Sequence, residues 1–144
     1  MPEFNTEEMA AFNKLIIEEF RKNNGSITVE PFVDGQLLLL HHVGAKSGAE
    51  RISPLGYTLD GDNVIIIASK GGTPENPAWF HNLLANPETT IELGPDTIEV
   101  TAEALTEGAE RERLFTQMAD RYPNFHEYQK NTDRLIPVVV LHRR

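Results

Sequence analysis

Cysteine does not occur among the 144 residues, which excludes disulfide bonds, thiolate nucleophiles and cysteine metal ligands. Apolar runs are short, and the run at residues 37–40 has the length of a strand, not that of a membrane-spanning helix. Residues 1–9 are acidic and polar and lack the apolar segment of a signal peptide. We therefore expect a cytoplasmic protein without a transmembrane segment, folded as one domain over residues 1–144.

Positive charge is also scarce. The chain has 13 lysines and arginines against 22 acidic residues, a net charge of −9, whereas a nucleic-acid partner needs a basic face. Between Gly44 and Gly72, however, three cations (Lys46, Arg51 and Lys70) balance three acids, so the acidic excess lies elsewhere. Cations gathered near two glycine-containing turns predict a small anionic ligand and no nucleic acid.

Residue patterns for metal binding and acid–base catalysis are missing as well. His41 and His42 are neighbours in a predicted strand and must point to opposite faces. The other three histidines, at positions 81, 126 and 142, have no ligand spacing. No carboxylate pair is placed for acid–base chemistry, and there is no nucleophile elbow. The sequence predicts no metal site and gives no signal for a catalytic triad.

The hydrophobic pattern predicts a helix first and then mostly strands. Over residues 6–22, Met9, Phe12, Ile16 and Phe20 recur at three- and four-residue steps, as in an amphipathic helix that covers a sheet. The strands that follow are short, and most are joined by hairpin turns. They are predicted at residues 26–33, 37–43, 51–59, 64–68, 89–93, 97–105 and 136–141.

Two further helices are predicted, at residues 77–85 and 106–121, the second with Leu114, Phe115 and Met118 turned inward. A short aromatic segment, residues 122–131, follows. Short strands in hairpins with few helices predict an antiparallel sheet closed into a barrel, with helices packed on it. The expected fold class is mainly β with flanking α-helices.

Residues 69–77 have the composition of an anion site. The apolar run 64–68 predicts a buried strand that ends at the Ser-Lys-Gly-Gly stretch of residues 69–72. Glycines let backbone N–H groups come close to a ligand, and Asn76 and Pro77 suit the N-cap and the first position of a helix. A strand end, a glycine turn, a lysine and a helix N-terminus together are typical of anion binding. The alternative is a surface loop with an exposed lysine.

The turn at residues 44–48, Gly-Ala-Lys-Ser-Gly, invites comparison with the phosphate loop of nucleotide hydrolases. Ala45 stands where that loop has a glycine before its lysine, and a hairpin follows where the loop needs a helix. What remains is a turn with Lys46 and Ser47, followed by a strand on which Arg51 and Ser53 share one face. A plain hairpin tip is the alternative.

Two groups of aromatic residues stand out. The helix at 77–85 is predicted to carry an apolar stripe of Trp79, Phe80, Leu83 and Leu84, with His81 and Asn82 off it. We expect Trp79 to pack in the core or at a subunit interface, and it can also wall a flat ring. Tyr122, Phe125 and Tyr128 recur at three-residue steps among polar neighbours, which favours a pocket lid over core packing.

Specific stretches occur in a fixed order from about Leu38 to the C-terminus. They are Gly44-Ala45-Lys46-Ser47-Gly48, Arg51-Ile52-Ser53-Pro54-Leu55, Ala68-Ser69-Lys70-Gly71-Gly72, Asn76-Pro77-Ala78-Trp79-Phe80-His81-Asn82-Leu83, Ala85-Asn86-Pro87, Tyr122-Pro123-Asn124-Phe125 and Thr132-Asp133-Arg134-Leu135-Ile136-Pro137-Val138-Val139. As a set, in order and spacing, they resemble the deazaflavin-dependent nitroreductase family.

The resemblance implies an FMN-binding-like split β-barrel that binds the deazaflavin coenzyme F-420. The reduced coenzyme would give a hydride to an electron-poor acceptor such as a quinone or a nitroaromatic, so the protein itself needs no triad. The resemblance assigns the coenzyme's anionic tail to Lys46, Ser47 and Arg51. It assigns the ring and its side chain to Ile52, Ser53, Pro54, Leu55, Ile67, Ala68, Ser69, Lys70, Ala78, Trp79, Phe80, His81, Asn82 and Phe125. Tyr122, Phe125 and Tyr128 are the candidates for the acceptor pocket.

The chain departs from the family pattern at three positions: Ala45 replaces a common arginine, Gly56 follows the Pro-Leu pair in place of an aromatic, and Phe125 lacks a tyrosine's hydroxyl. Two other functions fit the same residues. One is an FMN-dependent oxidoreductase on the same barrel, because a phosphate-bearing flavin also needs cations. The other is a coenzyme-binding module without turnover. Barrels of this kind commonly pair, which is compatible with a homodimer, although no residue of the sequence decides the oligomeric state.

Overall fold

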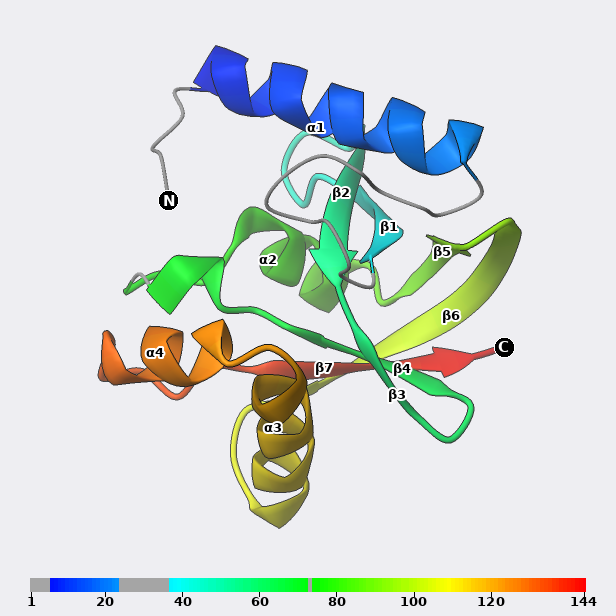
Figure 1. Ribbon diagram of the computed structural model, residues 1–144. Coiled ribbons are helices and arrows are strands. Elements are labelled where there is room, and N and C mark those ends of the chain that lie inside the picture. The colour runs from blue at the N-terminus through cyan, green and yellow to red at the C-terminus, as the bar shows by residue number, and fades with distance from the viewer. Residues whose placement is uncertain (1–5, 24–36, 73) are drawn as a thin grey trace.

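The computed structural model describes residues 6–23, 37–72 and 74–144. Seven antiparallel strands form a sheet in the order β2-β1-β5-β6-β7-β4-β3 (Figure 1). They are β1 (Leu37–Val43), β2 (Glu50–Gly56), β3 (Thr58–Asp60), β4 (Asn63–Ile67), β5 (Glu88–Leu93), β6 (Asp96–Leu105) and β7 (Val138–Arg143). The helices are α1 (Thr6–Lys22), the 3-10 turn η1 (Lys70–Gly72), α2 (Ala78–Ala85), α3 (Ala109–Arg121) and α4 (Asn124–Lys130).

The two edge strands, β2 and β3, follow each other in the chain with only Tyr57 between them. A segment that starts at one edge of a sheet and ends at the other makes the sheet curl around a core, which gives a split barrel. Figure 1 shows this segment crossing the molecule from β2 to the β3–β4 hairpin. The single strand expected at 51–59 is therefore wrong in one respect: it breaks at Tyr57, where the pairing partner changes from β1 to β4.

Strand β1 separates two layers of apolar contacts, because its alternate side chains point to opposite faces. Leu38 and Leu40 lie in the barrel core, whereas Leu37 and Leu39 pack on the other face against α1. The end of α1 is tied to the sheet by Arg21, whose Nε and Nη2 donate to the carboxylate of Glu92 on β5 at 3.0 and 2.8 Å. Helix α1 thus covers the sheet, as its periodicity predicts (Figure 1).

The barrel core is built from the inward-facing residues of six strands and from helix α2, which lies against β1 and β6. Its buried members are Leu38, Leu40, Val64, Ile66, Ala68, Trp79, Phe80, Leu83, Ile91, Val100, Val139 and Leu141. Trp79 is 7% exposed, so the expectation of core packing for this residue is confirmed. The predicted stripe on α2 is wrong at two positions, since Leu84 is exposed and Asn82 is buried in its place.

Helix α3 packs on the outer face of β4 and β7, below the barrel in Figure 1, and α4 lies against α3 and η1 at the left of the view. Leu114, Phe115 and Met118 are buried there, as predicted. Arg111 is only 2% exposed, and its guanidinium donates to the Ile136 carbonyl at 2.8 and 3.1 Å. This contact fixes the segment that leads into the last strand.

Other differences from the predicted elements have local causes. Strand β7 begins at Val138 because Pro137 has no N–H to donate to the sheet. Helix α3 begins at Ala109, after Gly108 at φ 100°, and not at 106. The strand expected at 26–33 and the side chains of Met9 and Phe12 lie outside the described residues. No helix in the described part of the chain is both long enough and apolar enough to span a membrane.

Candidate functional site

Residues 44–48 form a tight turn between β1 and β2. Gly44 N–H donates to the Ala49 carbonyl at 2.9 Å, and Gly48 N–H donates to the Gly44 carbonyl at 2.9 Å. Gly48 has a φ of 71°, which favours glycine, and a Cβ on Gly44 would lie 2.4 Å from Ser47 Oγ. The turn closes a hairpin, so the structure agrees with the sequence that this is no nucleotide phosphate loop.

Two cations flank this turn without a partner. Lys46 in the turn and Arg51 on β2 are both exposed, and neither forms an ion pair with any residue in the described part of the chain. Arg51 pairs with His42 and Ser53 with Leu40 in the β1–β2 register, so Arg51 and Ser53 share the face that continues into the barrel core. The predicted grouping of Arg51 and Ser53 is confirmed.

A partly buried chain of hydrogen bonds connects this hairpin to α2. Ala45 N–H donates to Asn82 Oδ1 at 2.9 Å, and the Asn82 amide nitrogen lies 2.9 Å from His42 Nδ1. The other ring nitrogen, His42 Nε2, lies 2.8 Å from Ser53 Oγ. His42 is 5% and Asn82 is 7% exposed, and both have partners on each side. The turn, strand β2 and helix α2 are thereby held as one unit.

His42 did not stand out in the sequence, where it was only one of two adjacent histidines. Burial first, and then the charges of Arg51 and His41, lower its pKa from 6.5 to about 4. The ring is therefore neutral near pH 7. His41 points to the other face, where its Nε2 lies 2.7 Å from the Glu92 carboxylate, so the predicted divergence of the two histidines is confirmed.

The second predicted cluster, at the end of β4, is held by Arg134. Its Nη2 donates to the Ser69 carbonyl at 2.8 Å, and its Nη1 donates to Asn76 Oδ1 at 2.8 Å and to the Ala68 carbonyl at 3.3 Å. The predicted N-cap role of Asn76 is wrong: Pro77 occupies the N-cap position, and the Asn76 oxygen is bound to the guanidinium instead. Sequence reasoning did not connect Arg134 with this cluster, because Arg134 is far from residues 68–76 along the chain.

Lys70 and η1 lie between this cluster and helix α4. Lys70 has a φ of 46°, unusual for a residue other than glycine, and its exposed ammonium lies 3.7 Å from a Glu75 carboxylate oxygen. A Cβ on Gly72 would lie 2.6 Å from the Tyr128 carbonyl oxygen, so the glycine permits α4 to approach the turn. The structure thus brings the aromatic segment next to the glycine turn.

The three aromatic residues predicted to line the acceptor pocket are partly exposed and also contact the hydrophobic core. Tyr122, Phe125 and Tyr128 are half-buried and pack against the α3 cluster. Their rings meet edge to face, with centroids 6.3 Å apart for Tyr122 and Phe125 and 5.7 Å apart for Phe125 and Tyr128. Burial, and to a lesser extent the charge of Tyr122, raises the pKa of Tyr57 above its ordinary value.

The remaining predicted residues divide between faces. Leu55 packs on the barrel core, whereas Ile52 packs with the α1 cluster on the outer face, and Pro54 shares that outer side through its pairing with Leu39. Ile67 and Ala68 are buried, and Ser69 is 8% exposed. On α2, Ala78 and His81 are exposed while Trp79, Phe80 and Asn82 are buried.

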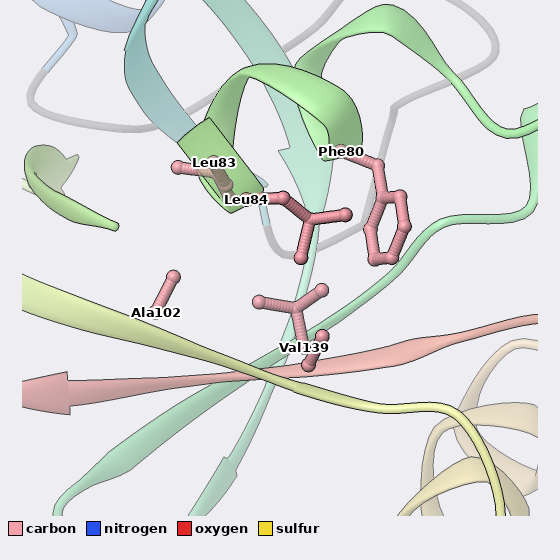
Figure 2. A pocket seen from close by; sticks show the side chains of 6 residues that line it. Phe80, Leu83, Leu84, Ala102 and Val139 are labelled. Carbon is pink, nitrogen blue, oxygen red and sulfur yellow. The ribbon is translucent and has the colours of Figure 1, made fainter. Parts of the chain in front are cut away.

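A small depression lies elsewhere, between α2 and strands β6 and β7 (Figure 2). The side chains that line it are all apolar: Phe80, Leu83, Leu84, Ala102, Ala104 and Val139. None of these side chains can donate a hydrogen bond to an anion. We therefore place the candidate site at the β1–β2 hairpin, η1 and the start of α2, where the cations and hydroxyls are.

On this split barrel, two exposed cations stand beside a hydroxyl-bearing strand, an arrangement suited to binding an anionic coenzyme. Comparison with known proteins identifies the family. Residues 13–143 match the family of F420H(2)-dependent quinone reductases. This chain belongs to that family of oxidoreductases, whose coenzyme is F-420.

Individual relatives agree with this assignment. An F420H(2)-dependent quinone reductase of Mycobacterium tuberculosis is 46% identical over 112 residues, which cover 74% of this chain and 73% of the relative. A solved F420-H2 dependent reductase (FDR-A) is 39% identical with a TM-score of 0.68, covering 74% of this chain and 93% of that one. The haem storage protein HutZ of Vibrio cholerae, 15% identical with a TM-score of 0.60, covering 92% of this chain and 90% of that one, shares the fold alone.

Proposed function

We propose that this protein reduces a quinone with reduced F-420, and that the β1–β2 hairpin binds the anionic part of the coenzyme. The observation that carries the proposal is the pair of exposed cations, Lys46 in the turn that Asn82 fixes and Arg51 on the strand that follows. Phosphate and carboxylate groups bind such cations through charge-assisted hydrogen bonds. When bound, the reduced coenzyme supplies the hydride, and the protein supplies binding, orientation and a pocket that excludes water.

The chain's own groups are suited to these tasks. Ser47 and Ser53 provide hydroxyl donors near the two cations, and the inward-facing side of β2 leads from them to the barrel core. The end of β4, from Ile67 to Lys70, and the start of α2, from Ala78 to Asn82, are proposed as the walls around the coenzyme's ring. Arg134 keeps the first of these walls in place through the Ala68 and Ser69 carbonyls.

The acceptor is proposed to bind beside the aromatic row of Tyr122, Phe125 and Tyr128. Half-buried rings that meet edge to face hold one another in place, and the exposed part of each ring can offer apolar surface to a planar acceptor. The close contact of Tyr128 with Gly72 sets this row next to the proposed coenzyme wall.

A homodimer is proposed for the assembled protein. A solved domain-swapped dimer is 32% identical to this chain with a TM-score of 0.70, and the match covers 96% of this chain and all of that one. Light scattering of the purified protein at several concentrations tests the oligomeric state. A single monomeric mass at all concentrations would contradict the dimer.

The proposed function is tested by titrating the purified protein with reduced F-420 and then adding a water-soluble quinone. We expect saturable binding, followed by oxidation of the coenzyme that depends on both protein and quinone. Parallel titration with reduced FMN distinguishes the flavin alternative, and binding without oxidation would identify a coenzyme carrier. A protein that binds FMN and not F-420 would overturn the proposal.

A further inference from the structure

Ala45, Asn82, His42 and Ser53 are connected by three successive hydrogen bonds, which we call the relay. The identity of the first donor decides in which direction every bond of the relay donates. A backbone N–H can only donate, so the Asn82 atom 2.9 Å from Ala45 N is the carbonyl oxygen Oδ1. The Asn82 amide NH₂ therefore faces His42 Nδ1 at 2.9 Å. An NH₂ group has no lone pair to accept with, so Nδ1 must be the unprotonated nitrogen of the ring.

The direction continues through the imidazole. With Nδ1 unprotonated, the ring hydrogen of neutral His42 is on Nε2, and this N–H donates to Ser53 Oγ at 2.8 Å. A second proton on Nδ1 would set two donors against each other. Burial, which lowers the pKa of His42, favours the same neutral ring.

Ser53 is the end of the relay. Because its oxygen accepts from His42, its own hydroxyl hydrogen is left to donate elsewhere. Ser53 is half-buried on the face of β2 that carries Arg51, and no acceptor for this hydrogen occurs among the described residues. We propose that His42 and Asn82 are positioning residues that make Ser53 a hydrogen-bond donor to an acceptor atom of the bound coenzyme. This inference rests on the proposed function.

The proposal identifies the recognised group by its chemistry: an oxygen or ring nitrogen with a lone pair, placed on the inner side of β2. It also distinguishes His42 from His41, which is adjacent in sequence but bound to Glu92 on the opposite face. His41 thus offers a matched control, since His41→Gln changes a neighbouring imidazole without touching the relay.

The first experiment measures the tautomer directly, in the protein without coenzyme. ¹⁵N-detected NMR of the histidine rings at neutral pH should give a pyridine-like shift for His42 Nδ1 and a pyrrole-like shift for Nε2. Asn82→Asp replaces the donor by an acceptor and should move the ring hydrogen to Nδ1 or charge the ring. A His42 protonated at Nδ1 in the wild type would overturn the relay whether or not F-420 binds.

The second experiment is a double-mutant cycle on the dissociation constant for reduced F-420. Ser53→Ala and His42→Leu should each weaken binding about tenfold, and the double variant should be no weaker than either single one. His42→Gln, which can accept from Asn82 and donate to Ser53, should stay within about threefold of wild type. His41→Gln should bind as the wild type does.

Two outcomes of the cycle contradict the relay. Additive losses from His42→Leu and Ser53→Ala would mean that His42 acts only through packing. An unchanged affinity in Ser53→Ala would mean that the hydroxyl makes no contact with the coenzyme. If the wild type binds no F-420, the proposed function fails, while the NMR result still decides the direction of the relay.

Discussion

Asn82 Oδ1 accepts a hydrogen bond from the Ala45 backbone N–H at 2.9 Å, which ties helix α2 to the turn between β1 and β2. The two residues are far apart in the sequence, yet this bond decides where Lys46 and Ser47 stand relative to the barrel. Asn82 is 7% exposed and also donates to His42, so its loss would leave the buried His42 Nδ1 and the partly buried Ala45 N–H without these partners.

Replacing Asn82 should therefore cost stability. We expect Asn82→Ala to lower the free energy of unfolding by about 1–3 kcal/mol, because the buried His42 Nδ1 loses its donor and one unsatisfied buried group costs about that much. Urea denaturation measures the change. His81→Ala, one residue earlier on the exposed side of α2, is the control and should stay within about 0.5 kcal/mol of wild type. Equal stability of the two variants would show that the Asn82 bonds contribute nothing.

Removing either Lys46 or Arg51 should weaken coenzyme binding without destabilising the fold. Lys46→Ala or Arg51→Ala is expected to reduce the affinity for reduced F-420 by about 1.5–3 kcal/mol, the worth of a hydrogen bond to a charged group. Both side chains are exposed, so the melting temperature should hardly change. Lys14 is an exposed lysine on α1, so Lys14→Ala controls for the change in net charge. If Lys14→Ala bound reduced F-420 as weakly as Lys46→Ala does, the assignment of Lys46 to the coenzyme site would be refuted.

Stability should depend on pH through His42. Its pKa is about 4 in the folded protein and near 6.5 when unfolded. Between these values the unfolded chain binds more protons, so the free energy of unfolding falls as the pH is lowered through this window. His42→Gln has no ring to titrate and should lack this part of the decrease. Denaturant unfolding of both proteins at stepped pH checks this.

Glu92 provides the internal reference for that experiment. Its hydrogen bonds with Arg21 and His41 lower its pKa below 4.5, so its contribution to stability is lost as the pH falls from about 4.5 downward, in both proteins alike. Acid unfolding curves that coincide for wild type and His42→Gln would contradict a neutral, buried His42.

Much of the fold could be predicted, because short-range signals determine it. The span of α1, the strand at 37–43 and the inward face of α3 agree with the periodicity of their apolar residues. The curling of the sheet could not be predicted in the same way. It depends on Tyr57, because the strand before this residue pairs with β1 and the strand after it pairs with β4. Such a change of pairing partner has no signature in the local sequence.

The residues of the candidate site could largely be predicted, whereas the hydrogen bonds between them could not. Lys46, Arg51 and Ser53 stood out through charge balance and strand parity. Asn82 was expected on the exposed side of α2, because helical periodicity ranks an amide below Leu84 for burial. Hydrogen bonds to Ala45 and His42 compensate for its burial, and no pattern within the helix contains those partners.

The aromatic row gives the last prediction, on Phe125. Its ring is half-buried between Tyr122 and Tyr128, so a lid role and a packing role predict different results. If the row contacts the acceptor, Phe125→Ala should lower turnover or change the preference among quinones while leaving the affinity for reduced F-420 nearly unchanged. Because the ring is only partly buried, the stability loss should be less than the about 3–5 kcal/mol typical of a buried phenylalanine. Phe115→Ala, at 5% exposure in the same cluster, supplies that larger loss as the control. Thermal unfolding and steady-state kinetics with several quinones measure both effects, and a Phe125→Ala protein as unstable as Phe115→Ala, with unaltered quinone preference, would assign the ring to the core.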